Sequence, residues 1–225
     1  MLVFERISQR AKDRVEFAPE NLIVAGWTGR DEKVVNHHIE ELAAIGVPRP
    51  SSVPVFYRNS AGNVTQAARI QVLGAHTSGE IEPVLVAMTD GLWVGVGSDH
   101  TDRQAETMGI ALSKQLCGKV MGATLWRHDE IAAHWDKLIL RAHATIGGSR
   151  VKYQEGALAA IRAPSDLIAR AGVDAMPPGT IMFCGTFAAI GGIRPGVRFE
   201  MELEDPVLRR SLTHAYDVEA LPVVT

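Results

Sequence analysis

The sequence predicts an α+β fold built on packed or rolled antiparallel sheets. Expected strands outnumber expected helices, most connections carry Gly or Pro, and strands do not alternate with helices as they do in βαβ proteins. The chain contains no internal repeat or low-complexity tract. We therefore expect one domain over residues 1–225, with N-terminal strands in residues 1–30 and a core in residues 31–225.

The first part of the chain is expected to hold four strands and one helix. Asp31 is a candidate N-terminal cap for a helix over residues 31–45, and Gly46 is a candidate stop signal. Apolar, β-branched and aromatic runs predict the strands Leu2–Phe4, Leu22–Ala25, Val53–Tyr57 and Ala68–Leu73.

The middle of the chain predicts a hairpin. Val84–Met88 and Leu92–Val94 flank Thr89-Asp90-Gly91, and Asp-Gly between two apolar runs is a strong hairpin signal. A helix is expected over Asp102–Leu116, with Asp102 able to cap it. Later strands are expected at Leu138–Ile146, Arg150–Tyr153, Thr180–Cys184, Val197–Leu203 and Leu208–Tyr216, with short helices at His128–His134 and Ser165–Ala171.

Three acidic residues form the strongest functional signal. Glu80 and Glu82 lie one residue apart, and on a strand such side chains share a face about 7 Å apart. The hairpin would return Asp99 to the same end of the sheet. An oxygen-only pocket of this kind suits Mg²⁺ or Mn²⁺. The alternative is that the glutamates line the wet face of a strand.

A second acidic run provides an internal comparison. Glu200, Glu202 and Glu204 alternate with apolar residues, as in a half-buried strand with one solvated face. We interpret these three glutamates as surface residues.

Composition excludes several classes of protein. The 225 residues are 46% hydrophobic and 22% charged, with a net charge of −3, and Lys and Arg form no run that would favour nucleic acid. No apolar stretch approaches the roughly 18 residues of a membrane span, so we expect a cytoplasmic protein without a membrane partner. Cys117 and Cys184 lack metal-ligand spacing and are expected to be reduced core residues.

A histidine and a glutamate on the first helix form a candidate catalytic dyad. His38 and Glu41 are three residues apart and therefore neighbours on one helical face. A carboxylate beside a histidine fixes its tautomer and makes it a competent general base. The alternative is an exposed helix turn with a casual contact, and His37 is a nearby competitor.

Together these motifs resemble the fumarylacetoacetate hydrolase superfamily. Residues 36–42 resemble its His-x-x-Glu helix, Glu80 and Glu82 its Glu-x-Glu pair, and residues 99–103 its Asp-x-(Thr/Ser)-x-Arg loop. Residues 53–59, residues 138–168, Gly118-Lys119 and residues 178–200 also follow the family's order. Departures at Arg58 and Phe187, and a short segment between Glu82 and Asp99, suggest a divergent bacterial branch.

The resemblance implies a fumarylacetoacetase C-terminal-domain-like mixed β-roll or sandwich with peripheral helices. It also implies metal ligation by Glu80, Glu82 and Asp99, catalysis by His38, Glu41 and Lys119, and substrate binding by Arg103, Gly185 and Thr186. For Arg103 we favour bracing of the Asp99 loop over substrate contact. The implied cofactor is Mg²⁺, with Mn²⁺ or Ca²⁺ as alternatives, and the implied assembly is a homodimer.

Three functions follow as hypotheses. The first is a Mg²⁺-dependent hydrolase that cleaves a carbon–carbon bond in an acylpyruvate-like 2-oxo acid or a 1,3-dicarbonyl compound. The second is a 2-oxo acid lyase or isomerase, a decarboxylase, dehydratase or tautomerase, on the same metal site. The third is a catalytically silent binding or scaffold protein that keeps the fold.

Overall fold

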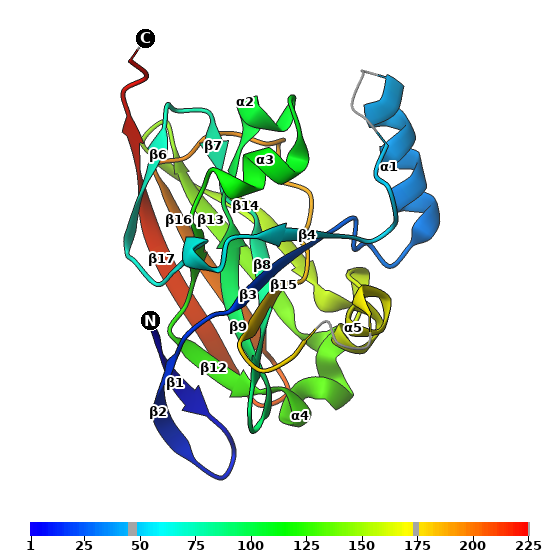
Figure 1. Ribbon diagram of the computed structural model, residues 1–225, viewed down its shortest axis with the longest axis vertical. Coiled ribbons are helices and arrows are strands. Elements are labelled where there is room, and N and C mark those ends of the chain that lie inside the picture. Colours follow the sequence, from blue (N-terminus) through cyan, green and yellow to red (C-terminus); the bar gives the residue numbers. More distant parts are fainter. Residues whose placement is uncertain (45–48, 173–175, 225) are drawn as a thin grey trace.

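The computed structural model describes residues 1–44, 49–172 and 176–224. Two large β-sheets pack against each other, with short helices around them (Figure 1). Strands β13, β16 and β17 of the smaller sheet contact β8 and β9 of the larger one. The prediction of an α+β fold on packed sheets is confirmed.

The larger sheet has ten strands within the described residues, and its main path runs β2-β1-β12-β9-β8-β15-β3-β4, with β11 joining β9 to β5. Most neighbouring pairs are antiparallel, but β1 with β12, β3 with β15 and β5 with β11 are parallel. The strands are β1 (Leu2–Ile7), β2 (Lys12–Phe17), β3 (Asn21–Gly26), β4 (Val55–Asn59), β5 (Val64–Thr65), β8 (Ile81–Met88), β9 (Gly91–Asp99), β11 (Lys119–Met121), β12 (Thr124–Arg127) and β15 (Thr180–Phe183).

The smaller sheet has the order β14-β13-β16-β17-β6. Its strands are β14 (Ser149–Ala157), β13 (Ile139–Ile146), β16 (Arg198–Asp205), β17 (Arg210–Leu221) and β6 (Arg69–Leu73). A separate two-stranded pair, β7 (Thr77–Ser78) with β10 (Thr101–Asp102), lies beside the end of β9 where Asp99 is found.

The helices are short and peripheral. In Figure 1, α1 projects to one side beyond β3 and β4, and α2 and α3 lie over the end of the sheets near β7. Their bounds are α1 (Glu32–Ala44), α2 (Arg103–Glu106), α3 (Ile110–Gln115), α4 (His128–Ile131) and α5 (Pro164–Ala171), with 3₁₀ turns at Ala61–Asn63, Ala132–Lys137 and Leu158–Ala160.

The core has two parts because the central strands are buried on both faces. Leu85, Val94 and Met201 belong to the layer between the two sheets. On the opposite face, Val84 and Phe183 join buried residues that all come from strands of the larger sheet, which therefore curls around a second core. This rolled arrangement explains why all of β8 except Met88 is buried, and burial on both faces accounts for its nearly unbroken apolar sequence.

Most elements lie where the sequence predicts them, including the hairpin of β8 and β9 closed at Met88 and Gly91. Asp31 accepts a hydrogen bond from the backbone N–H of Lys33 and so caps α1 as expected, whereas the stop signal at Gly46 lies outside the described residues.

One predicted helix is wrong. Residues 102–116 form two helices, α2 and α3, because the chain turns extended at Gly109, and glycine is a poor helix former. Asp102 nevertheless caps α2 by accepting from the backbone N–H groups of Gln104 and Ala105. Strands β2, β5, β7, β10, β11 and β12 were not predicted.

Candidate metal centre

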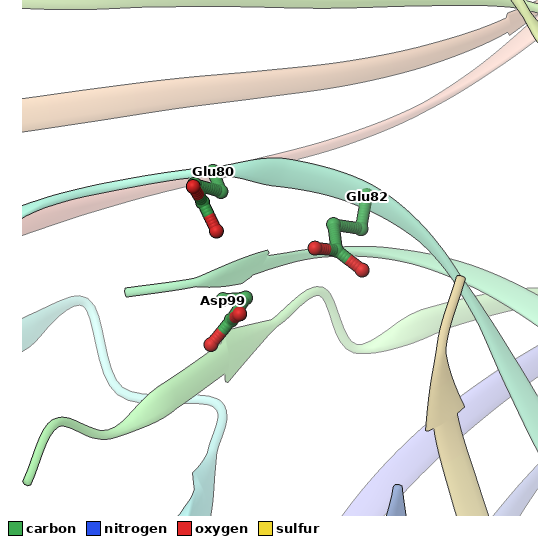
Figure 2. Close-up of side chains that lie close together, drawn as sticks. All are labelled: Glu80, Glu82 and Asp99. Atoms are coloured by element: carbon green, nitrogen blue, oxygen red, sulfur yellow. The ribbon is translucent and has the colours of Figure 1, made fainter. Parts of the chain in front are cut away.

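Three carboxylates converge at one end of the β8–β9 hairpin. Glu80 immediately precedes β8, Glu82 is its second residue, and Asp99 is the last residue of β9. One oxygen of each side chain lies within 4.8 Å of the others, and Figure 2 shows the three groups pointing toward a common space. Asp99 is fully buried and Glu82 is 2% exposed. The predicted convergence is confirmed, whereas metal ligation stays a prediction.

Backbone contacts fix this end of the hairpin. The N–H of Asp99 donates to the carbonyl of Glu80 at 2.9 Å, and the N–H of Glu80 donates to the Ser98 hydroxyl at 3.1 Å. A side chain at Gly79 would come within 2.7 Å of the Tyr216 hydroxyl, so only glycine lets the chain pass there. The close approach sets the position from which Glu80 enters the site.

The segment after β15 holds Glu82 in place. The backbone N–H of Gly185 donates to Glu82 Oε2 at 2.6 Å, and Gly185 has a φ of 99°, a conformation that favours glycine. The Thr186 hydroxyl donates to the carbonyl of Ile81 at 2.6 Å and accepts from Gln154 at 2.7 Å. Substrate binding by Gly185 and Thr186 stays a prediction; in this structure both groups organise the acidic cluster.

Three cationic side chains contact the acidic cluster. Lys119 Nζ lies 2.9 Å from Asp99 Oδ1, and Arg103 lies 2.9 Å from Glu80 Oε1. Lys114, from α3, contacts Asp99 Oδ2 and lies 3.3 Å from Glu80 Oε2. The contact of Arg103 is the one expected of a bracing residue, and substrate contact by Arg103 and catalysis by Lys119 stay predictions.

Burial and neighbouring charges shift the pKa values of Asp99 and Glu82 in opposite directions. Burial would raise the pKa of Asp99, but the ammonium groups of Lys114 and Lys119 outweigh it and lower that pKa to about 2. No lysine or arginine of the described residues pairs with Glu82, so burial, together with the charge of Asp99, raises its pKa well above the usual value. Burial opposes the charge of Lys114, but the nearby carboxylates raise its pKa overall. The cluster is therefore short of positive charge on the Glu82 side.

His100 follows Asp99 but faces another direction. Its ring nitrogens lie 2.9 Å from the Tyr216 hydroxyl and 2.8 Å from the Thr77 hydroxyl, which agrees with its omission from the predicted ligands. Burial, helped by the charge of Lys119, lowers the pKa of His100 to about 3, so the ring is neutral at physiological pH. The histidine joins the acidic hairpin to the smaller sheet.

The predicted dyad of His38 and Glu41 falls on α1. Both residues belong to that helix, but their side chains lie outside the described residues. Their catalytic role stays a prediction.

The donor set fits a hard divalent cation. It consists only of carboxylate oxygens, which Mg²⁺ and Mn²⁺ prefer, and the ligand atoms come from a hairpin that is rigidly placed in the sheet. The raised pKa of Glu82 points the same way, since a cation at this position would favour its ionised form.

Residues 25–216 match the family described as "Protein of unknown function (DUF2848)". The chain belongs to this family. No curated protein matches the sequence.

Solved structures with the same fold are fumarylacetoacetate hydrolase-like proteins. A Burkholderia cenocepacia protein provisionally named a fumarylpyruvate hydrolase is 20% identical, with a TM-score of 0.63 over 98% of this chain and 96% of its own. The yeast protein ynq8, a fumarylacetoacetate hydrolase family protein, is 17% identical, with a TM-score of 0.62 over 92% and 95% of the two chains.

A third solved structure holds a metal and a ligand. It is 2-keto-3-deoxy-D-arabinonate dehydratase complexed with magnesium and 2,5-dioxopentanoate, which is 16% identical, with a TM-score of 0.62 over 94% of this chain and 85% of its own. The predicted resemblance to the fumarylacetoacetate hydrolase superfamily is confirmed at the level of the fold. Within the described ranges, no helix is long and apolar enough to cross a membrane.

Two residues that shape the site escaped the sequence analysis. Lys114 looks like an ordinary solvated lysine on a predicted helix, although it lies only five residues before Lys119. Gln154 is 2% exposed and accepts from the N–H of Ile81 while its amide donates to Thr186, but nothing in its local sequence signals this contact.

Proposed function

We propose that the protein is a divalent-cation-dependent enzyme that hydrolyses a carbon–carbon bond in an acylpyruvate-like 2-oxo acid or a 1,3-dicarbonyl compound. The observation that supports it most is the buried cluster of Glu80, Glu82 and Asp99. The shared fold with a hydrolase family is consistent with this reaction class.

In this proposal each side chain of the site has a role. Glu80, Glu82 and Asp99 hold the ion, which is Mg²⁺ with Mn²⁺ or Ca²⁺ as alternatives. When bound, the ion would supply positive charge to stabilise negative charge developing on the substrate oxygens. Lys119, held against Asp99, adds a second positive charge at the same place.

The remaining roles concern the attacking water and the substrate. His38, oriented by Glu41, removes a proton from the water that attacks the carbonyl carbon. The bond from that carbon to its neighbouring carbon then breaks, its electron pair passes to the departing enolate, and the enolate takes back the proton from His38. Gly185 and Thr186 hold the substrate carboxylate. The protein acts in the cytoplasm as a homodimer, which light scattering on the purified protein would test.

A scaffold function accounts poorly for the acidic cluster. Burying the carboxylates of Glu82 and Asp99 beside the partly buried Glu80 is costly unless they are paired or bind a metal, and a protein that needed only the fold could replace them by apolar residues. The structural cost therefore supports a chemical use of the site.

One alternative reaction deserves the same test. The dehydratase that shares this fold was solved with magnesium and a dioxo compound, which favours a lyase on the same metal site as the second candidate. Such a lyase, or a related isomerase, would need His38 only to move a proton and no attacking water.

The deciding experiment offers two substrates in the presence of Mg²⁺ and follows products by NMR. Pyruvate and acetate from acetylpyruvate support the hydrolase, whereas pyruvate and carbon dioxide from oxaloacetate support the lyase. Glu82→Gln should abolish either reaction, and the matched control Glu202→Gln, on the exposed face of β16, should retain it. Equal turnover by these two variants would reject the proposed site.

A further inference from the structure

Lys114 occupies the space between two of the candidate ligands. Its ammonium group contacts Asp99 Oδ2 and lies 3.3 Å from Glu80 Oε2, and the side chain is 8% exposed. The residue belongs to α3, a helix that lies outside both sheets (Figure 1). It is the cation that bridges the two strands of the site.

In each of the carboxylates of Asp99 and Glu80, one oxygen contacts Lys114 and the other oxygen contacts a different cationic side chain. Lys119 contacts Asp99 Oδ1 and Arg103 contacts Glu80 Oε1, whereas Lys114 is the one cationic side chain among the described residues that contacts the other oxygen of each carboxylate. A divalent ion that bridges Asp99 and Glu80 through these two oxygens would lie where the Lys114 ammonium group now lies. The ion and the ammonium group therefore require the same position.

The ring of Tyr57 offers the Lys114 ammonium group a second position beside the acidic cluster. Lys114 Nζ lies 6.0 Å from the ring centroid of Tyr57, a half-buried residue of β4, and cations bind favourably near aromatic faces at such distances. Because the lysine side chain has four flexible carbons, the ammonium group can move away from the carboxylates and closer to this ring without any movement of α3.

We propose that Lys114 is an internal cation that fills the metal pocket of the free protein and leaves it, toward Tyr57, when a divalent ion binds. This inference rests on the proposed function, because it takes the acidic cluster to be the metal site. Lys114 thus lowers the metal affinity of the free protein.

The displacement of Lys114 also has a consequence for the ligand. The net charge of the site with a divalent ion bound determines which compounds it attracts. Glu80, Glu82 and Asp99 carry three negative charges when ionised, and Lys114, Lys119 and Arg103 carry three positive charges. A divalent ion brings two further positive charges into the same volume. The site then has an excess charge of +2, which an anionic compound such as a 2-oxo acid lowers, so metal and anion bind cooperatively, and Lys114 is the residue that couples them.

Calorimetric titration with Mg²⁺ of wild type, Lys114→Met and the surface control Lys152→Met tests this competition. Lys114→Met should bind Mg²⁺ about tenfold more tightly than wild type, the effect of removing one charge-assisted contact, while Lys152→Met should match wild type. Oxalate, a small anionic chelator corrected for its own Mg²⁺ binding, should tighten the binding of Mg²⁺ to wild type more than to Lys114→Met.

Equal or weaker Mg²⁺ binding by Lys114→Met would overturn the inference while leaving the proposed function intact. Absence of Mg²⁺ binding in all three proteins would instead remove the proposed metal site, and the inference with it.

A second measurement needs no variant. Acetylation of the wild-type protein by an amine-reactive reagent, read by peptide mass spectrometry, should modify Lys114 slowly in EDTA and faster in Mg²⁺. Lys119, which is fully buried, should stay protected, and Lys152 should react equally in both. Unchanged protection of Lys114 at saturating Mg²⁺ would show that the lysine does not leave the pocket.

Discussion

Two glutamate runs with the same Glu-x-Glu pattern have opposite surroundings in this protein. Glu82 lies on β8, which is covered on both faces, and shares its pocket with Asp99. Glu202 lies on β16, where buried and partly exposed residues alternate, and its side chain is 36% exposed and lies 3.3 Å from Arg141. The pattern alone therefore does not distinguish a site from a surface; a third acid returned by a hairpin does.

The electrostatics of the two runs differ accordingly. On β16 the carboxylates are partly exposed and face arginines across the strand surface. Arg150, for example, lowers the pKa of Glu200. At the hairpin end burial is the largest influence on each acid, and only the contacts with lysine and arginine keep Glu80 and Asp99 ionised. The run on β16 is stable as it stands, whereas the cluster at the hairpin end needs cations.

The largest difference in stability should appear when one acid of the cluster and one acid of the β16 run are each neutralised. Asp99→Asn leaves the buried Lys114 and Lys119 without their shared partner, so the free energy of unfolding in EDTA should fall by about 3–5 kcal/mol. Glu204→Gln removes a partly exposed partner of Arg141 and should cost less than about 1 kcal/mol. Urea denaturation of both variants measures the contrast, and similar losses would mean that Asp99 is not the centre of the cluster.

The second largest difference between the two glutamate runs should be the effect of a substitution on Mg²⁺ affinity. Glu82→Gln should weaken Mg²⁺ binding by more than about 100-fold, because even partners outside the ligand shell cost 10–100-fold in metal sites. Glu202→Gln should leave the affinity unchanged. The shift in melting temperature on adding millimolar Mg²⁺ reports both, and a full shift in Glu82→Gln would contradict the assignment.

A histidine beside each run extends the comparison to pH. The pKa of His100 is lowered to about 3, so its contribution to stability is complete above about pH 6.5 and is lost as the pH falls toward 3. Between pH 6.5 and 5.0 this loss amounts to about 2 kcal/mol. His143 is paired with Glu200 on the other sheet and is more exposed.

His100→Gln should therefore flatten the pH dependence of the unfolding free energy in EDTA, and His143→Gln should change it far less. Denaturation of wild type, His100→Gln and His143→Gln at pH 6.5 and pH 5.0 gives the loss of unfolding free energy of each protein, and each variant is then compared with wild type. Parallel curves for wild type and His100→Gln would show that His100 is not held neutral.

The smallest expected effect has the opposite sign to the others. The raised pKa of Glu82 means that the folded, metal-free protein holds a proton that the unfolded chain releases, so this group destabilises the fold increasingly as the pH rises from about 4.3 toward its raised value. Glu82→Gln should therefore stabilise the metal-free protein at pH 8 by about 1 kcal/mol, as neutral replacements of buried charges often do. A destabilised variant in EDTA would contradict the assigned cause.

Local sequence patterns predicted the parts of this fold that depend on local chemistry. The turn at Asp90-Gly91, the cap at Asp31 and the alternation in β16 each reflect contacts between near neighbours in the chain, and all three lie where they were predicted. Strand β2 was missed because Lys12–Phe17 is largely exposed at the sheet edge and therefore reads as a polar turn.

Local spacing predicted the site only as far as its acids, and the family resemblance added the residues expected around them. Glu80, Glu82 and Asp99 belong to one hairpin, so their spacing fixes their convergence. Lys114 and Gln154 reach the cluster from α3 and the smaller sheet, and which face of a helix or strand meets another element depends on packing that spacing does not encode.

The most direct test of the metal centre is anomalous diffraction from crystals grown with Mn²⁺. We predict one peak between Glu80, Glu82 and Asp99, about 2.0–2.3 Å from an oxygen of each, with the Lys114 ammonium group displaced from Asp99. A map without a peak at this position, with Lys114 still bridging Asp99 and Glu80 at saturating Mn²⁺, would contradict the account.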